Sequence, residues 1–124
     1  MYKRQVLFLG WSYKPGVGDA RETPVEPLAQ NLIESGASIS AWDPYLSMRD
    51  YPKGITVIED ITSAKGFDLV VLATAHKECI GIDWVSLHKG MRTPILYDGR
   101  RVLDLQKMRG MGWITNAVGS PIKY

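Results

Sequence analysis

Two short and wholly apolar runs constrain the fold of this chain more than any other feature. Residues 6–9 read Val-Leu-Phe-Leu before a glycine, and residues 69–73 read Leu-Val-Val-Leu-Ala. Short, uniformly apolar runs are typical of β-strands buried on both faces, which is the usual situation in a parallel sheet. Parallel neighbours need crossover segments, commonly helices, that lie on the faces of the sheet. The two runs therefore predict an α/β domain.

The rest of the chain alternates between helix and strand patterns. Thr23-Pro24-Val25-Glu26 predicts a helix start, because threonine can cap, proline suits the first helical position and glutamate can complete a capping box. The remaining predicted strands are residues 38–42, 55–58, 94–97 and 112–115, and the remaining predicted helices are residues 60–65, 82–88 and 102–109. This alternation predicts a Rossmann-like, doubly wound domain with a mainly parallel sheet of about six strands and helices on both faces. We expect the 124 residues, 1–124, to form one domain.

Charge and cysteine content narrow the class of function. The chain has 15 basic and 13 acidic residues, a net charge of +2, which gives no reason to expect a nucleic-acid partner. Cys79 is the one cysteine, so no internal disulfide can form, and we expect a cytoplasmic location by default. With His76 and His88, this cysteine lacks the spacing of a zinc site. No apolar run approaches the roughly 20 residues that span a bilayer, so we expect neither a metal nor a membrane partner.

The loops at the carboxyl ends of the strands are the expected ligand side, because open α/β sheets bind ligands there. The first such loop carries Lys14 and Arg21 ahead of a helix whose free N-terminal amides favour an anion. Tyr13 stands beside the lysine and can pack on a base or a ribose. The loop lacks the G-x-G-x-x-G pattern that binds dinucleotides. Two interpretations remain: a site for a phosphate-bearing ligand, or a solvated loop whose charges pair with Asp19 and Glu22.

Three later loops carry further candidates. In the Asp98-Gly99-Arg100-Arg101 turn, a guanidinium can hold a phosphate or a sugar hydroxyl, or the aspartate and the arginines simply pair and cap the next helix. Asp43 precedes a proline and is interpreted as a turn residue in preference to a ribose ligand. Residues 76–79, His-Lys-Glu-Cys, are interpreted as a surface loop rather than a catalytic cluster. Trp11 is the tryptophan placed on the binding side, whereas the other three are assigned to the core.

Three motifs, in order along the chain, resemble those of the UDP-glucose/GDP-mannose dehydrogenase family. The first has the pattern Gly-x-x-(Phe/Tyr)-Lys-x-x-x-x-Asp-x-Arg-Glu-Ser, which opens the C-terminal domain of that family. Here it reads Gly10-x-x-Tyr13-Lys14-Pro15-x-x-x-Asp19-x-Arg21-Glu22-Thr23, with threonine in place of serine. The other two are Asp43-Pro44-Tyr45 and Asp98-Gly99-Arg100-Arg101-Val102-Leu103-Asp104.

The resemblance implies a specific role for this chain. Family members oxidise the C6 hydroxymethyl group of a nucleotide sugar with NAD, and their C-terminal domain closes over the substrate. An N-terminal domain holds NAD and a central helix makes the homodimer. Carried over by motif, Tyr13 and Lys14 contact the UDP-sugar, Arg100 holds its uridine-ribose end, and Arg21 reaches NAD across the interdomain cleft. UDP-glucose is the expected substrate, although Thr74-Ala75-His76 resembles relatives that act on UDP-N-acetylhexosamines.

Parts of such an enzyme are missing from this sequence. It contains no Gly-Gly-x-Cys segment to supply a nucleophile, and Cys79 lies in a different context. Hydride transfer needs a bound nicotinamide and a positioned base, for which the chain offers no motif. We therefore expect no catalytic residue here and no dehydrogenase activity from the chain alone. A stand-alone, non-catalytic nucleotide-binding module is the alternative from another class.

Overall fold

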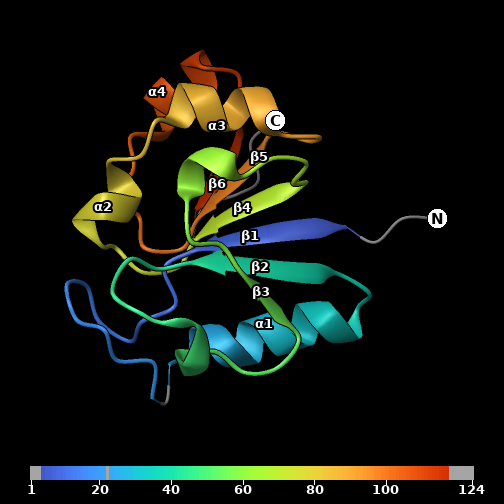
Figure 1. Cartoon of the computed structure of the whole chain (residues 1–124). Helices are drawn as coiled ribbons and strands as arrows, with labels where there is room; N and C mark the ends of the chain where they lie inside the picture. The colour runs from blue at the N-terminus through green and yellow to red at the C-terminus, as the bar shows by residue number, and fades with distance from the viewer. Residues whose placement is uncertain (1–3, 22, 118–124) are drawn as a thin grey trace.

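In the part of the chain that the structure describes, six strands form one sheet in which every neighbouring pair is parallel (Figure 1). The computed structural model describes residues 4–21 and 23–117. The strands are β1 (Gln5–Leu9), β2 (Ser38–Trp42), β3 (Ile55–Val57), β4 (Leu69–Leu72), β5 (Ile95–Asp98) and β6 (Ile114–Ala117). Their order in the sheet is β3-β2-β1-β4-β5-β6, the order of a doubly wound Rossmann fold. The fold class predicted from the sequence is confirmed.

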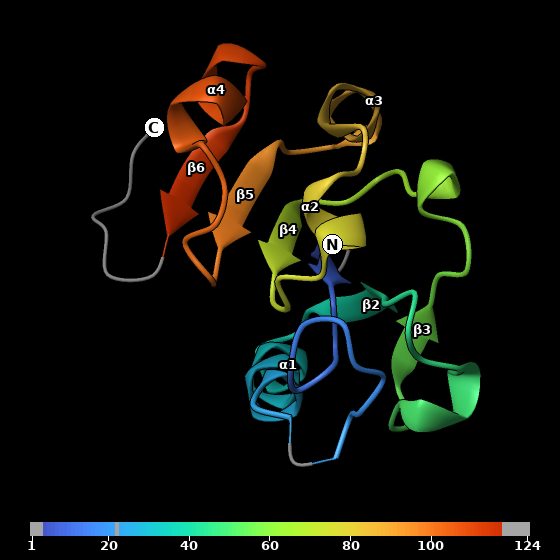
Figure 2. The same ribbon diagram turned by 90° about the vertical axis from the view of Figure 1, so that its left-hand side faces the viewer.

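Within the described residues, four α-helices and two short 3-10 turns join the strands. The helices are α1 (Val25–Glu34), α2 (Lys77–Ile80), α3 (Trp84–Gly90) and α4 (Leu105–Gly110), and the turns are η1 (Met48–Asp50) and η2 (Ile61–Ser63). In Figure 2, α1 lies on one side of the sheet, and α3 and α4 lie on the other. Helices therefore lie on both faces, as the alternating pattern predicts.

The central strand β1 sends alternate side chains into two separate cores, because successive residues of a strand point to opposite faces. Leu7 and Leu9 pack with Trp84, Leu87 and other residues of the α3 side. The intervening side chains of β1 pack on the α1 side, with Val25 among their neighbours. Both faces of β1 are buried, which explains why its sequence is apolar throughout.

The helix starts differ in detail from the predicted ones. The capping residue of α1 is Pro24, and the N–H of Glu26 bonds to the carbonyl of Thr23 at 3.4 Å, so the predicted capping box is wrong. Glu22, the residue before Thr23, lies outside the described residues. The helices predicted over 82–88 and 102–109 begin later, at α3 and α4, because Asp83 and Asp104 accept amide hydrogen bonds and cap them.

One side of the sheet keeps an apolar groove of about 370 Å³ beside α1. The groove crosses β4, β5 and β6, and its lining includes Leu28, Leu32, Val71, Ile95, Tyr97 and Ile114. Leu28 is 43% exposed, which is unusual for a helix residue that faces a sheet. The described residues, 4–21 and 23–117, therefore leave part of the α1-side face uncovered.

Candidate functional site

The loops that follow β1 and β4 leave the sheet side by side at its carboxyl edge. The chain turns from β1 toward β2 on one side and from β4 toward β5 on the other, which creates the switch point where such sheets bind ligands. The amides of Ala73 and Thr74 donate to the carbonyl of Leu9 at 2.9 and 3.3 Å. Gly10 has a φ of +89°, and a Cβ there would lie 2.5 Å from Thr74 Cβ. Only glycine fits this contact.

Asp43 organises the loops at this edge. Its Oδ2 accepts the amides of Trp11 and Ser12 at 2.8 and 2.9 Å and the Ser12 hydroxyl at 2.7 Å, while Oδ1 accepts the amide of Tyr45 at 2.9 Å. Burial alone raises the pKa of Asp43, but these hydrogen bonds outweigh it and hold the pKa below its ordinary value. Both carboxylate oxygens are engaged in these contacts, so Asp43 is a structural turn residue. This agrees with its interpretation from the sequence.

His76 joins the same cluster from the loop after β4. Its Nε2 lies 2.9 Å from Asp43 Oδ2, and its Nδ1 accepts the amide of Gly16 at 2.8 Å. Both side chains of the Asp43–His76 pair have no solvent exposure. The surface-loop interpretation of residues 76–79 is therefore wrong, because His76 and Cys79 are buried and residues 77–80 form α2.

Two further residues at this edge belong to the core. Burial, with Asp43 and Glu78 nearby, raises the pKa of the Cys79 thiol to about 12, so the thiolate that attacks substrates is not populated at neutral pH. Trp11 is completely buried and packs against Phe8, with ring centroids 5.9 Å apart. Its placement on the binding side is wrong, because its ring packs in the core on the α1 side of the sheet.

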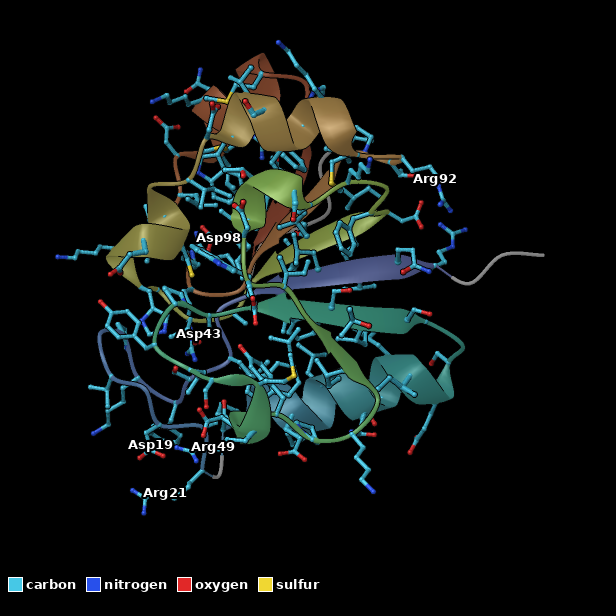
Figure 3. The ribbon with its side chains drawn as sticks, viewed as in Figure 1. Asp19, Arg21, Asp43, Arg49, Arg92 and Asp98 are labelled. Atoms are coloured by element: carbon cyan, nitrogen blue, oxygen red, sulfur yellow. The ribbon has the colours of Figure 1, made fainter. Side chains whose placement is uncertain are left out.

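The first loop presents Tyr13, Lys14 and Arg21 to solvent. A hydrogen bond of 2.8 Å from the amide of Tyr13 to the carbonyl of Asp19 closes the loop. Arg21 bonds to Asp19 at 3.0 Å and, with a smaller effect of the Lys14 charge, lowers the pKa of Asp19 to about 2. The pairing interpretation therefore holds for Arg21, while its other expected partner, Glu22, lies outside the described residues. Figure 3 shows Asp19 and Arg21 at the outer end of the loop, away from Asp43 and Asp98.

Arg100 lies against the end of β4. Its Nε donates to the carbonyl of Ala73 at 2.8 Å. The buried Asp98 accepts the amides of Arg100 and Leu103 at 3.0 and 2.8 Å, so it shapes the turn, and the capping residue of α4 is Asp104. The predicted alternative, in which Asp98 caps the next helix, is wrong because the turn continues to Asp104.

A pocket of about 210 Å³ opens beside Arg100 at the switch point. Its lining includes Pro24 and Val25 of the α1 N-terminus, Ala73 of the β4 loop, and Tyr97 and Gly99 of the β5 loop. The Arg100 guanidinium favours an anion and the Tyr97 ring offers an apolar wall. The start of α1 adds few free amides, because Pro24 and Pro27 have no N–H and the amides of Val25 and Glu26 bond to Thr23. Lys14 and Arg21 do not line this pocket in the described part of the chain. The structure thus brings Arg100 to α1, and places the other two cations on the adjoining loop.

The described residues of this edge form neither a metal cluster nor a nucleophile–base pair. Among residues 4–21 and 23–117, no three His, Cys, Asp or Glu side chains gather closely enough to hold a metal ion. Ser12 and His76 both bond to the same oxygen of Asp43 and not to each other, so they do not form a nucleophile–base pair. Over the same described residues, none of the helices has the length and apolar character needed to cross a membrane.

The strand order, the switch point and the anion-favouring pocket define a Rossmann-like domain of the ligand-binding kind. Residues 7–105 match the UDP binding domain of the UDP-glucose/GDP-mannose dehydrogenase family. This chain belongs to that family. The match covers all three motifs from which the sequence resemblance was drawn, up to Leu105.

Similar proteins are sugar-nucleotide dehydrogenases. The chain is 31% identical to UDP-glucose 6-dehydrogenase of Pseudomonas aeruginosa, over 95% of this chain and 28% of that protein. It superposes with a TM-score of 0.83 on an NDP-N-acetyl-D-galactosaminuronic acid dehydrogenase from Methanosarcina mazei, at 26% identity over 94% of this chain and 25% of the other. A UDP-glucose dehydrogenase from Pyrobaculum islandicum gives a TM-score of 0.65 at 28% identity, over 90% of this chain and 26% of the other. The chain thus spans about a quarter to a third of the length of these relatives.

Proposed function

We propose that this chain is the UDP-sugar-binding domain, residues 1–124, of an NAD-dependent UDP-sugar 6-dehydrogenase, with UDP-glucose as the substrate. The observation that carries the proposal is the pocket at the switch point, which Arg100 lines together with the first residues of α1. A guanidinium presents a fork of N–H donors that can hold the hydroxyls of a ribose or the adjoining phosphate oxygens. The match to a UDP binding domain names the nucleotide.

Each predicted site residue has a role in this proposal. Tyr13 and Lys14 contact the nucleotide sugar from the exposed loop, and Arg100 holds the uridine-ribose end in the pocket. Arg21 reaches NAD bound by another domain, and its side chain, 89% exposed and directed away from the strand ends, suits a contact outside this domain (Figure 3). No catalytic residue is assigned to this chain.

The rest of the enzyme supplies NAD and the nucleophile. The connection from β1 to α1 runs from Gly10 to Pro24 and folds into a closed loop, so it does not form the tight glycine turn that cradles a dinucleotide. The residues present therefore do not fit NAD binding by this domain.

The apolar groove beside α1 suits the expected central helix of the homodimer, because a buried helix presents the apolar side chains that the groove would cover. A cytoplasmic location remains part of the proposal.

Titration with UDP tests the proposal at residue level. We expect Lys14→Ala and Arg100→Ala each to weaken UDP-sugar binding to the enzyme by about 1.5–3 kcal/mol, because each removes a charge-assisted hydrogen bond. Calorimetric titration of the parent and variant proteins measures the difference. The control is Lys89→Ala, an exposed lysine near the end of α3, which should leave affinity unchanged. Parent-like binding of both test variants would remove these assignments.

A UDP-N-acetylhexosamine dehydrogenase is the second candidate. The observation that favours it is the higher TM-score with the M. mazei enzyme than with the P. islandicum UDP-glucose dehydrogenase. Comparing kcat/KM for UDP-glucose and UDP-N-acetylglucosamine in the enzyme that contains this chain separates the two. Tight UDP binding by the 124-residue chain alone would instead favour the stand-alone module, since the dehydrogenase proposal places about half of the ligand contacts in other domains.

A further inference from the structure

His76 connects three loops at the carboxyl edge of the sheet. It lies in the loop after β4, receives the amide of Gly16 from the loop after β1, and contacts Asp43 after β2. The ring has no solvent exposure. A buried polar ring with both nitrogens engaged is a specific arrangement, because an unmatched nitrogen there would cost free energy.

The partners of the ring determine its protonation state. A backbone amide can only donate, so Nδ1 must carry a lone pair and cannot carry a proton. The proton therefore sits on Nε2, which donates to Oδ2 of Asp43. The ring is the neutral Nε2–H tautomer, and an imidazolium would have no acceptor for Gly16.

Neighbouring contacts hold the ring and the loop against each other. The Tyr45 ring stacks on His76 with centroids 4.5 Å apart, and the Tyr45 hydroxyl donates to Glu78 on α2 at 2.7 Å. A Cβ on Gly18 would clash with the carbonyl oxygen of Tyr45, so the loop rests directly on this residue. The closed loop that carries Lys14 is thus fastened at Gly16 and supported at Gly18.

We propose that His76 is a positioning residue for ligand binding: its neutral ring fastens the Lys14 loop to Asp43 in the conformation that receives the nucleotide. The inference rests on the proposed function, since it assigns His76 a role through Lys14. His76 itself is too deeply buried to touch a ligand. Its two hydrogen bonds have separate tasks, because Nδ1 holds the loop and Nε2 anchors the ring to the end of β2.

Two substitutions separate these tasks. In His76→Gln, the side-chain amide can take the place of Nε2 and donate to Asp43, but nothing accepts the amide of Gly16. In His76→Asn, the side-chain oxygen can take the place of Nδ1 and accept from Gly16, but the bond to Asp43 is lost. Three quantities are measured on the 124-residue chain: hydrogen exchange of the Gly16 amide, UDP affinity by NMR titration, and unfolding by urea.

Gly16 exchange and UDP affinity are expected to rank the variants in the same order, and stability is expected not to follow that order. His76→Gln exchanges the Gly16 amide about tenfold faster and binds UDP about fivefold more weakly, the effect of losing one hydrogen bond. His76→Asn keeps both values near those of the parent, although its stability falls. The Nδ1 nitrogen of the parent ring shows the chemical shift of an unprotonated nitrogen.

Two results would overturn the inference. One is Gly16 exchange in His76→Gln equal to that of the parent, and the other is UDP affinity that follows the stability of the variants and not their Gly16 protection. A parent chain in which UDP shifts no resonance of the Lys14 loop would contradict the proposed function instead. The exchange measurement needs no ligand, so in that case it still decides whether His76 holds the loop.

Discussion

Asp43 is the residue on which the ligand-side loops most depend. Four hydrogen-bond donors from three residues converge on its Oδ2, and all three residues lie more than 30 positions away in the sequence. A buried carboxylate is stable only when hydrogen bonds compensate for the lost water, and here they do so while keeping it ionised. Its charge and geometry are therefore part of the fold.

Replacing the Asp43 carboxylate should change how the free energy of unfolding depends on pH. Because the folded-state pKa of Asp43 is lowered, its contribution to stability is complete above the unfolded value of about 3.9 and is lost as the pH falls through the folded value. Asp43→Asn should lower the free energy of unfolding by about 2–3 kcal/mol at neutral pH. The difference between parent and variant should shrink below pH of about 4.

Urea unfolding at a series of pH values measures this difference. Glu34→Gln, an exposed position at the end of α1, is the control and should change stability little at any pH. A difference between Asp43→Asn and the parent that stays constant into the acid range would contradict the lowered pKa.

At the scale of elements, the end of β1 and the end of β4 approach each other closely because a glycine, Gly10, lies at the contact. The φ of Gly10 is +89° and its missing side chain makes room for Thr74, whose hydroxyl donates to the carbonyl of Ser12 at 2.8 Å. The two loops of the switch point can therefore begin in contact and then diverge.

Alanine at this position tests the close approach. Gly10→Ala adds a strained φ and a clash with Thr74, whereas Gly54→Ala, at a φ of +94° with no atom within 4 Å, adds only the strain. We expect Gly54→Ala to cost about 1–2 kcal/mol and Gly10→Ala several kcal/mol more, measured by urea unfolding. Equal costs for the two variants would show that the ends of β1 and β4 can separate freely.

At the scale of the whole molecule, the chain resembles one part of a larger enzyme. It covers 25 to 30% of the length of similar dehydrogenases, and its sheet leaves an apolar groove beside α1. Exposed apolar surface of this kind is common where another domain or subunit packs. The proposed function accordingly assigns binding to this chain and the chemistry to other parts of the enzyme.

The proposed division predicts that the chain alone has no dehydrogenase activity. The purified 124-residue chain, mixed with UDP-glucose and NAD, should form no NADH above a blank without protein, because its one cysteine is buried and the proposed function places the nicotinamide site in another domain. Absorbance of NADH measures the outcome. Activity above the blank, proportional to the amount of chain, would contradict it.

The sequence by itself determined the fold class and the family. Runs such as Leu69–Leu72 must be buried on both faces, and that requirement predicts a parallel sheet without any knowledge of contacts. The motif around Lys14 is local, so it is legible in the sequence. Patterns of this kind depend only on which residues are neighbours along the chain, so they can be recognised without knowing the tertiary contacts.

Only the tertiary structure decided which residues at the carboxyl edge are buried. His76 lies 33 residues from Asp43 and 60 from Gly16, and nothing in its local sequence shows that these partners meet. The same holds for Trp11, a loop residue by position whose ring packs in the core. Burial depends on what folds back over a segment, and such long-range packing is not encoded in any short stretch of sequence.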